Sequence, residues 1–294
     1  MNNHENLTVI IVTFKTNEKI LFNCIDSINK VIKILIIENS NDQFFKNKLE
    51  KKYQNVTVFL SGKNLGYGAG NNLGLRYIKT RYALISNPDV EYNRDFFDKL
   101  SYYISGKIEF NIIGASYNDE SHYAPAGYFD KKNSNNVFNE IGLKEVDWIV
   151  GCTMLFDTQK MKTQNYFDEN FFMFWEETDL CRRTKINGGK IFCSSKLLIN
   201  HLGHKGSTGS NPEYVIESEM LRNWHLMWSQ FYYIKKNSNY FSAFFSMSGK
   251  LIRSFIKMII FTLFYNKAKQ TMYYARFSGL INSMIGSKSW YRIK

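Results

Sequence analysis

Short apolar runs separated by segments of helical length constrain the fold of this chain more than any other sequence feature. Leu7–Phe14, Ile32–Ile37, Val56–Leu60 and Tyr82–Ser86 each have the length and composition of a buried strand. Between the first two lies an amphipathic segment that Asn17 can cap as a helix. This alternation predicts an α/β fold, with a mostly parallel sheet flanked by helices and joined by right-handed crossovers.

Polar side chains follow the ends of these predicted strands. Thr13 ends the first, Glu38, Asn39 and Ser40 follow the second, and Asp89 follows the last. The carboxyl ends of parallel strands converge on one crevice, so we expect these groups to lie close together. A single aspartate at a strand end is more often a helix cap than a ligand. Oxygen ligands of this kind nevertheless suit Mg²⁺ or Mn²⁺, which take one or two protein groups plus substrate phosphates.

A glycine-rich segment, KNLGYGAGNNLG, covers Lys63–Gly74. Its glycines allow tight turns, and its amides at a helix start would suit a nucleotide or a sugar diphosphate. The spacing is neither GxGxxG nor GxxxxGK[ST], which disfavours the cofactors that those motifs bind. An ordinary loop before a helix over Leu73–Thr80 fits the composition equally well.

Three carboxylates, Glu176, Glu177 and Asp179, lie within the stretch FFMFWEETDLCRR at Phe171–Arg183. The pattern predicts an apolar segment that delivers acids to the first turn of a helix. A carboxylate among aromatic side chains and arginines can have the proton affinity that general-base chemistry needs. The alternative is that these acids only complement the helix dipole.

The remaining half of the predicted body is less regular. Residues 118–145 form a polar stretch that could be a flap, and Ile191–Phe192 and Leu197–Ile199 are short apolar segments. His201 follows the last of these and precedes a glycine- and serine-rich piece, where it could reach a metal or a phosphate. A buried, hydrogen-bonded histidine is the alternative. From Pro212 onward the chain has the pattern of helices.

The charge is distributed unevenly along the chain. The net charge is +12, yet all 26 acidic residues lie at or before Glu219. Residues 1–219 therefore form a neutral predicted domain, and residues 220–294 a wholly basic, helical extension. Within it, Ser248–Tyr265 predicts a basic amphipathic helix suited to an anionic membrane surface, too short in its apolar run to span a bilayer. Packing on the body or a homodimer face is the alternative; no motif suggests nucleic acid.

The four cysteines show no metal-binding or disulfide spacing, and no secretory signal opens the chain. We therefore expect reduced thiols and a cytoplasmic location, peripheral on the inner face of the plasma membrane.

Taken in order, the blocks VIIVTF, IIENSN, NLGYGAGNNLG, ISNPDV, DWIVGCTML, FFMFWEETDLCRR and NHLGHKGS resemble glycosyltransferase family 2 in its rhamnosyltransferase-like branch. The resemblance covers about residues 7–225. It implies the GT-A fold, a Rossmann-like α/β sheet, followed here by the helical basic extension.

The resemblance also implies roles for individual residues. The nucleoside side of a dTDP-sugar or UDP-sugar donor would be held by Thr13, Glu38, Asn39, Ser40, Lys63, Asn64, Gly68 and Asn71. Asp89 and His201 would bind Mg²⁺ or Mn²⁺, and Asp147, Trp148 and Gly151 would lie beside the acceptor. Glu177 matches the catalytic base, with Glu176 and Asp179 left open as alternatives, and Arg222-Asn223 resembles a late Arg-Asn pair. Glu38 and Glu177 each stand where the family usually has aspartate.

The implied function is inverting, metal-dependent transfer of a sugar, rhamnose foremost, to a hydroxyl of a saccharide acceptor. A lipid-linked acceptor in lipopolysaccharide or O-antigen synthesis would suit the basic extension. A binding scaffold without turnover is the alternative from another class, although it would not need Asp89, Glu177 and His201 together. An enzyme that makes the activated donor would normally carry a basic glycine-rich N-terminal signature, which is absent from this sequence.

Overall fold

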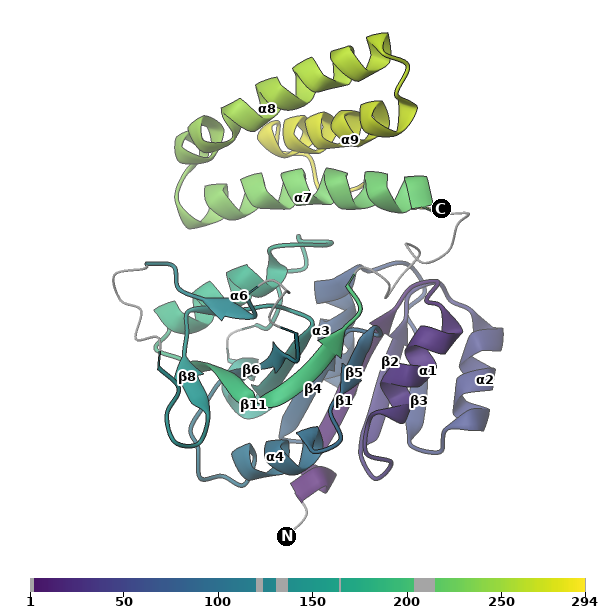
Figure 1. The fold of residues 1–294 in the computed structure, drawn as a ribbon, viewed down its shortest axis with the longest axis vertical. Helices are drawn as coiled ribbons and strands as arrows, with labels where there is room; N and C mark the ends of the chain where they lie inside the picture. The colour runs from purple at the N-terminus through teal and green to yellow at the C-terminus, as the bar shows by residue number, and fades with distance from the viewer. Residues whose placement is uncertain (1–2, 120–123, 131–136, 164, 204–214, 294) are drawn as a thin grey trace. The chain divides into compact units, whose positions relative to one another are not determined.

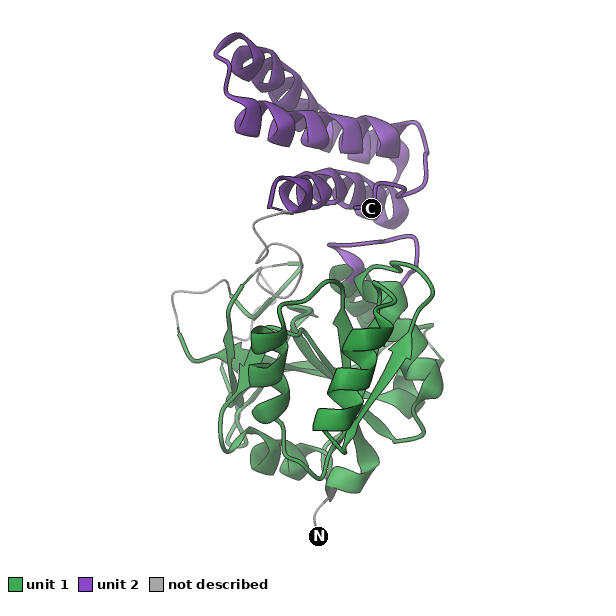
Figure 2. Ribbon diagram, turned by 90° about the vertical axis from the view of Figure 1, so that its right-hand side faces the viewer, with its two compact units in different colours: residues 1–167, 177–210 green, residues 168–176, 211–294 purple. Residues whose placement is uncertain are grey.

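The computed structural model describes residues 3–119, 124–130, 137–163, 165–203 and 215–293 (Figure 1). The chain divides into two compact units (Figure 2). Unit 1 comprises residues 1–167 and 177–210, and unit 2 comprises residues 168–176 and 211–294. The second unit therefore takes a short segment from the middle of the chain as well as its C-terminal part.

Unit 1 is built on a mixed sheet. Where the chain is described, its strands run in the order β3-β2-β1-β4-β10-β6-β11-β5, with β8 beside β11 (Figure 1). The strands are β1 (Leu7–Thr13), β2 (Lys33–Glu38), β3 (Val56–Leu60), β4 (Tyr82–Ser86), β5 (Val90–Tyr92), β6 (Ile112–Tyr117), β8 (Leu143–Glu145), β10 (Thr153–Asp157) and β11 (Ile191–His201). The half from β3 to β4 is parallel, as predicted, whereas β10 runs antiparallel to both of its neighbours. A separate antiparallel pair joins β7 (Ala126–Gly127) to β9 (Trp148–Ile149).

Helices cover both faces of this sheet. They are the 3-10 helix η1 (Asn3–Asn6) and the α-helices α1 (Glu18–Asp26), α2 (Gln43–Lys52), α3 (Tyr67–Tyr77), α4 (Phe96–Tyr103), α5 (Thr158–Lys162) and α6 (Glu176–Ile186). Side chains of a strand alternate between faces, so Val9 and Ile11 join one buried cluster with residues of α1 and α2. Ile10 joins the other cluster, with Leu75 of α3. The continuous apolar run of β1 reflects burial on both faces.

The predicted cap of the first helix is confirmed. The Asn17 side chain accepts hydrogen bonds from the amides of Lys19 and Ile20 at the start of α1. The predicted start of the next glycine-rich helix at Leu73 is wrong, because α3 already begins at Tyr67.

Glycine makes this earlier start possible. Gly66 precedes α3 with φ +83°, a left-handed conformation that favours glycine. Within the helix, a Cβ at Gly70 would lie 2.9 Å from a methyl of Val12, and one at Gly74 would lie 2.6 Å from a methyl of Ile10. These two glycines therefore allow the helix to pack closely on β1, and the segment is a helix rather than the loop that its composition also allowed.

The two apolar segments before His201 form one strand rather than two. Strand β11 pairs with β6 in parallel, and its register shifts between Cys193 and Leu198, as in a β-bulge. Beyond the bulge, β11 pairs antiparallel with the short strand β5, so that His201 lies opposite Val90. All four cysteines of the chain are buried and free.

Unit 2 contains the helices α7 (Val215–Asn237), α8 (Tyr240–Leu263) and α9 (Lys267–Met284) (Figure 2). Helices α7 and α9 approach closely at Gly279, where a Cβ would lie 2.2 Å from the carbonyl oxygen of Trp224. Pro212, from which helical pattern was predicted, lies outside the described residues. Within the described part of the chain, no helix combines the length and the apolar character needed to cross a membrane.

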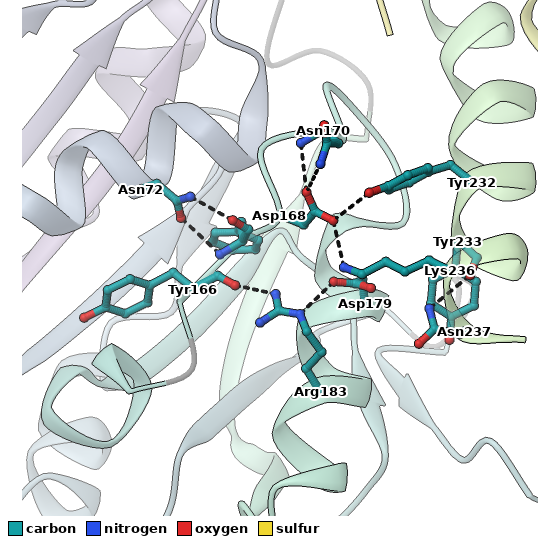
Figure 3. A network of polar contacts seen from close by, with 11 residues as sticks. Asn72, Tyr166, Asp168, Asn170, Asp179, Arg183, Tyr232, Tyr233, Lys236 and Asn237 are labelled. Carbon is teal, nitrogen blue, oxygen red and sulfur yellow. Dashed lines mark hydrogen bonds and ion pairs between the residues drawn. The ribbon is translucent and has the colours of Figure 1, made fainter. Parts of the chain in front are cut away.

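Residues 168–176 attach to α7 by polar and aromatic contacts within unit 2, and Figure 3 shows the polar contacts of Asp168. The Asp168 carboxylate accepts hydrogen bonds from the Tyr232 hydroxyl, at 3.1 Å, and from the Lys236 ammonium group, at 2.7 Å. The Ser229 hydroxyl donates to the carbonyl of Met173 at 2.8 Å. Aromatic ring pairs add to these bonds: Phe171 with Tyr232, Phe172 with His225 and Trp175 with Tyr233.

Candidate active site

The ends of β1 and β2 bring the first group of predicted site residues together. Thr13 and Glu38 are neighbours in the parallel register, and the Asn39 amide donates to the Thr13 carbonyl at 2.9 Å. The Glu38 carboxylate is buried, and it accepts hydrogen bonds from the amides of Ser40 and Asp42 at 3.0 and 2.9 Å. Glu38 therefore shapes the turn that follows β2.

Three buried side-chain oxygens near this turn and on α3 have no hydrogen-bond partner among the described residues. They belong to Thr13, Asn39 and Asn71, each of which is at most 2% exposed. The amide nitrogens of both asparagines are occupied, that of Asn39 by the Gly66 carbonyl and that of Asn71 by the Tyr67 carbonyl. A buried polar atom without a partner is costly, and such atoms are uncommon away from binding sites. These oxygens are thus suited to accept hydrogen bonds from a ligand.

The other residues of the glycine-rich segment surround the start of α3. Gly66 offers no side chain to cap the helix, so the first-turn amides have no side-chain acceptor at that position. The Asn64 side chain accepts from the Gly66 amide at 3.1 Å, Gly68 is buried in the first turn, and Lys63 is exposed. An uncapped helix N-terminus beside a lysine is chemically suited to phosphate.

Asp89 and His201 are brought together by strand pairing. The Leu202 amide donates to the Asp89 carbonyl at 3.1 Å, next to the β5–β11 pairing. The Asp89 side chain is 2% exposed, and its Oδ1 atom lies 3.4 Å from Nε2 of His201. The imidazole also stacks on the Tyr117 ring.

The distance between these two atoms fits a pair of metal ligands. Ligands at adjacent octahedral positions, each about 2.1 Å from Mg²⁺, lie about 3 Å from each other. Across the described ranges, no group of three or more histidines, cysteines, aspartates or glutamates could hold a metal ion. Asp89 and His201 would therefore need oxygens from a substrate to complete a coordination shell.

The three acids at the start of α6 lie in different environments. Asp179 is fully buried, and its carboxylate accepts from Nε of Arg183 at 2.8 Å (Figure 3). Arg183 also donates to the carbonyl of Tyr166. Asp179 is thus engaged in an ion pair that fixes this end of the helix, whereas Glu176 clusters with unit 2. The sequence contained a signal for this difference, since only Asp179 has an arginine four residues later.

Glu177 lies in an environment that changes the pKa of its carboxyl group. Burial raises the pKa of Glu177 above its usual value of 4.5. Its Oε2 atom is buried and has no hydrogen-bond partner in the described part of the chain. A Cβ at Gly151 would lie 3.4 Å from Cβ and Cγ of Glu177, so the glycine lies directly against this side chain.

The segment around Gly151 carries the predicted acceptor residues. The Asp147 carboxylate accepts from the Phe129 amide at 2.9 Å and thus supports the β7–β9 pair. The Trp148 indole lies against Gly127, where a Cβ would be 2.4 Å from the ring. Asp147 therefore has a structural task, and the half-buried indole is held in a fixed position.

Tyr67 is a neighbour of this site that the sequence analysis did not single out. Its hydroxyl donates to the carbonyl of Gly151. The hydroxyl oxygen would also lie 3.6 Å from a Cβ placed on that glycine. Its position inside NLGYGAG was the available signal. Within unit 2, Asn223 of the Arg222-Asn223 pair binds Arg276 through its side chain, at 2.7 Å, and so links α7 to α9.

Comparison with known proteins gives the same picture of the fold. A crystal structure of GalNAc-T7 with UDP, GalNAc and Mn²⁺ superimposes with a TM-score of 0.56 at 15% identity, covering 79% of this chain and 50% of that one. A mannosyltransferase from Pyrobaculum calidifontis, in complex with GDP-Man and Mn²⁺, gives a TM-score of 0.54 at 10% identity, covering 95% and 87%. At these identities the likeness establishes the fold alone.

Sequence comparison finds related enzymes. A hexosyltransferase of low-salt glycan biosynthesis from Haloferax volcanii is 28% identical over 212 residues, 63% of this chain and 64% of that protein. This chain thus spans less than two thirds of that relative's length. Rhamnosyltransferase WbbL of Escherichia coli is 24% identical over 195 residues, 58% of this chain and 73% of its own. An N-acetylglucosaminyl-diphospho-decaprenol L-rhamnosyltransferase of Mycobacterium tuberculosis is 22% identical over 243 residues, 70% and 78%.

The sheet and its helices have the GT-A fold of these structural neighbours. Residues 8–150 match the model of the family described as glycosyl transferase family 2. The predicted fold is confirmed, and the predicted resemblance to glycosyl transferase family 2 agrees with this match, whereas the assignments of individual site residues stay predictions.

Proposed function

We propose that this protein is an inverting, metal-dependent glycosyltransferase. It would move a sugar from a nucleoside-diphosphate donor to a hydroxyl of a saccharide acceptor. The observation that carries the proposal is the convergence of Asp89 Oδ1 and His201 Nε2, 3.4 Å apart, where β5 pairs with the end of β11. Two protein ligands completed by diphosphate oxygens are a typical arrangement for Mg²⁺ or Mn²⁺ in phosphate-handling sites.

The donor is assigned to the crevice at the ends of β1 and β2. The unpaired oxygens of Thr13, Asn39 and Asn71 would accept hydrogen bonds from the nucleoside, and the uncapped start of α3 would face the diphosphate. We favour a dTDP-sugar carrying rhamnose, because two of the relatives are named rhamnosyltransferases. A UDP-sugar is the other candidate.

The metal would neutralise the charge that develops on the departing nucleoside diphosphate. The chain's own part would be to orient the donor through Asp89, directly before β5, and His201, at the end of β11, whose separation the pairing of these two strands fixes. The Tyr117 ring stacks on the imidazole of His201 and so limits the rotation of that side chain.

Glu177 is the proposed catalytic base. Its carboxylate would take the proton of the acceptor hydroxyl while the hydroxyl oxygen attacks the anomeric carbon from the face opposite the departing diphosphate. One displacement inverts the anomeric centre, so no nucleophilic side chain is needed. Asp179 is a weaker candidate because its charge is paired with Arg183.

Trp148 and Gly151 would lie beside the acceptor, with Asp147 holding the segment in shape. A lipid-linked saccharide fits the basic composition of residues 220–294, which contain no acidic residue and would attach to an anionic membrane surface. Such a protein would work on the inner face of the plasma membrane, in assembly of lipopolysaccharide or a related surface polysaccharide.

Replacing Glu177 with glutamine tests this proposal. The variant removes the base and keeps the side-chain shape, so we expect donor binding to persist while turnover falls at least about 10²-fold. Calorimetric titration with dTDP-rhamnose and UDP-sugars in the presence of Mn²⁺ measures binding, and release of nucleoside diphosphate measures turnover.

Glu140→Gln is the matched control, because Glu140 is an exposed residue of the same unit. This variant should retain both donor binding and turnover. Turnover by E177Q close to that of the original protein would refute the base assignment. Donor binding without any turnover in the unaltered protein would instead favour a scaffold.

A further inference from the structure

Helix α8 presents an apolar stripe away from the rest of unit 2. The stripe consists of Phe241, Phe245, Ile252, Ile256, Ile259 and Leu263. Their spacing of three, four and seven residues places them along one side of the helix. Phe241, Phe245 and Leu263 are 71%, 74% and 70% exposed, far more than large apolar side chains of a packed helix.

The opposite side of α8 packs within the unit. Ala243, Met247 and Ser254 are buried there. Two lysines also make contacts on this side: Lys250, which is exposed, donates to the side chain of Gln230 on α7, and Lys257 donates to the Tyr273 hydroxyl on α9. A water-facing helix usually buries its large apolar side chains, whereas α8 leaves most of its largest apolar side chains exposed.

The turn after α8 continues the stripe and adds positive charge. Phe264 and Tyr265 are 77% and 94% exposed. Lys267 and Lys269, at the start of α9, are exposed beside them, and Arg253 is exposed on α8 itself. Because residues 220–294 contain no acidic side chain, nothing in this sequence region offsets that charge.

We propose that α8 lies flat in the interface of an anionic bilayer, with its apolar stripe among the acyl chains. A surface helix of this kind needs a long apolar face and flanking cations, both of which α8 and its turn supply. The basic flank distinguishes an anionic lipid surface from an apolar protein partner. The inference deepens the proposed function by naming the element that would bring the enzyme to a lipid-linked acceptor, and it rests on that function in this respect alone.

Vesicle flotation of the full chain tests the inference. We expect the protein to float with vesicles of phosphatidylglycerol and phosphatidylcholine, and at least about tenfold less with phosphatidylcholine alone. The double variant Phe241→Ser/Phe245→Ser should lower partitioning more than about tenfold, because each side chain loses a large apolar area. Phe44→Ser is the matched control, since Phe44 on α2 is 77% exposed and should not affect flotation.

Two further measurements keep the result interpretable. Circular dichroism melts should show that the double variant is folded, and turnover with a water-soluble acceptor should be unchanged by it. Flotation of the double variant equal to the original protein, or no flotation of the original protein, would overturn the inference. A dimer in sedimentation that the double variant breaks, without vesicle binding, would assign the stripe to a second copy of the chain instead. Turnover without flotation would support the proposed function and overturn the membrane inference. Flotation without turnover would support the membrane inference and contradict the proposed function.

Discussion

At the scale of single residues, the site depends on how the charges at the start of α6 are divided. Asp179 is paired with Arg183, whereas the Oε2 atom of Glu177 is buried and has no hydrogen-bond partner among the residues that the structure describes. A helical spacing of four predicts the first pair from the sequence. The burial that sets Glu177 apart depends on Gly151, which is 26 positions earlier in the chain and is brought there only by folding.

The raised pKa of Glu177 predicts a pH-dependent effect on stability. An acid whose pKa is higher in the folded state favours folding while it is protonated, and this contribution is lost as the pH rises through the folded-state pKa. E177Q should therefore unfold at a higher temperature than the original protein at pH 7. The difference should shrink toward pH 4, where the carboxyl group is protonated.

Thermal melts of both proteins between pH 4 and pH 8 measure this difference. If Glu177 is the base, as proposed, the acid limb of the kcat/KM profile should likewise fall at a pH above 4.5, because the carboxylate must be ionised to accept a proton. Equal melting temperatures of the two proteins at every pH would contradict the raised pKa.

The ion pair of Asp179 predicts a loss of stability when its partner is removed. Arg183→Met leaves the fully buried carboxylate without this arginine and should lower the free energy of unfolding by about 3 kcal/mol. Urea denaturation monitored by tryptophan fluorescence measures the change.

Arg182→Met controls for the general effect of removing an arginine from the same helix. Arg182 lies over the Phe129 ring rather than beside a buried acid, so its loss should cost much less. Similar losses for the two variants would contradict the structural role assigned to Asp179.

At the scale of elements, the strands of the parallel half could be predicted because most of their residues are apolar, and β1 and β4 are buried on both faces. Val56–Leu60 and Tyr82–Ser86 coincide with β3 and β4. The start of α3 could not be predicted in the same way, since four glycines in one segment lower intrinsic helix propensity. Close packing on β1 explains why the helix nevertheless begins at Tyr67.

Alanine substitution of two glycines should separate packing from helix propensity. Gly74→Ala places a methyl group 2.6 Å from Ile10 and should lower the free energy of unfolding by about 1–3 kcal/mol. Gly249→Ala, in the interior of α8 with no atom within 4 Å of the new methyl group, should raise it by up to about 1 kcal/mol. Denaturant titrations of the two variants measure both changes in the free energy of unfolding. A gain in stability for both would mean that α3 is not held against β1 as described.

At the scale of the whole molecule, local patterns indicated helices after Pro212 but gave no sign that residues 168–176 cluster with them. That grouping comes from contacts such as Asp168 with Lys236, 68 positions apart, and such long-range pairs leave no periodicity in the sequence. The outward side of α8 was similarly hidden. Its amphipathic pattern could be recognised in the sequence, but the side that packs within the unit is shown by the burial of Ala243, Met247 and Ser254 in the structure.

The interleaving of the two units also limits how such a protein can be recombined. Because unit 2 takes residues 168–176 as well as the C-terminal helices, the chain passes between the two units more than once. Exchange of the helices alone between relatives would separate Asp168 and Met173 from the α7 side chains that bind them. Inheritance of the helical unit as a module thus requires the short internal segment and the C-terminal part to change together.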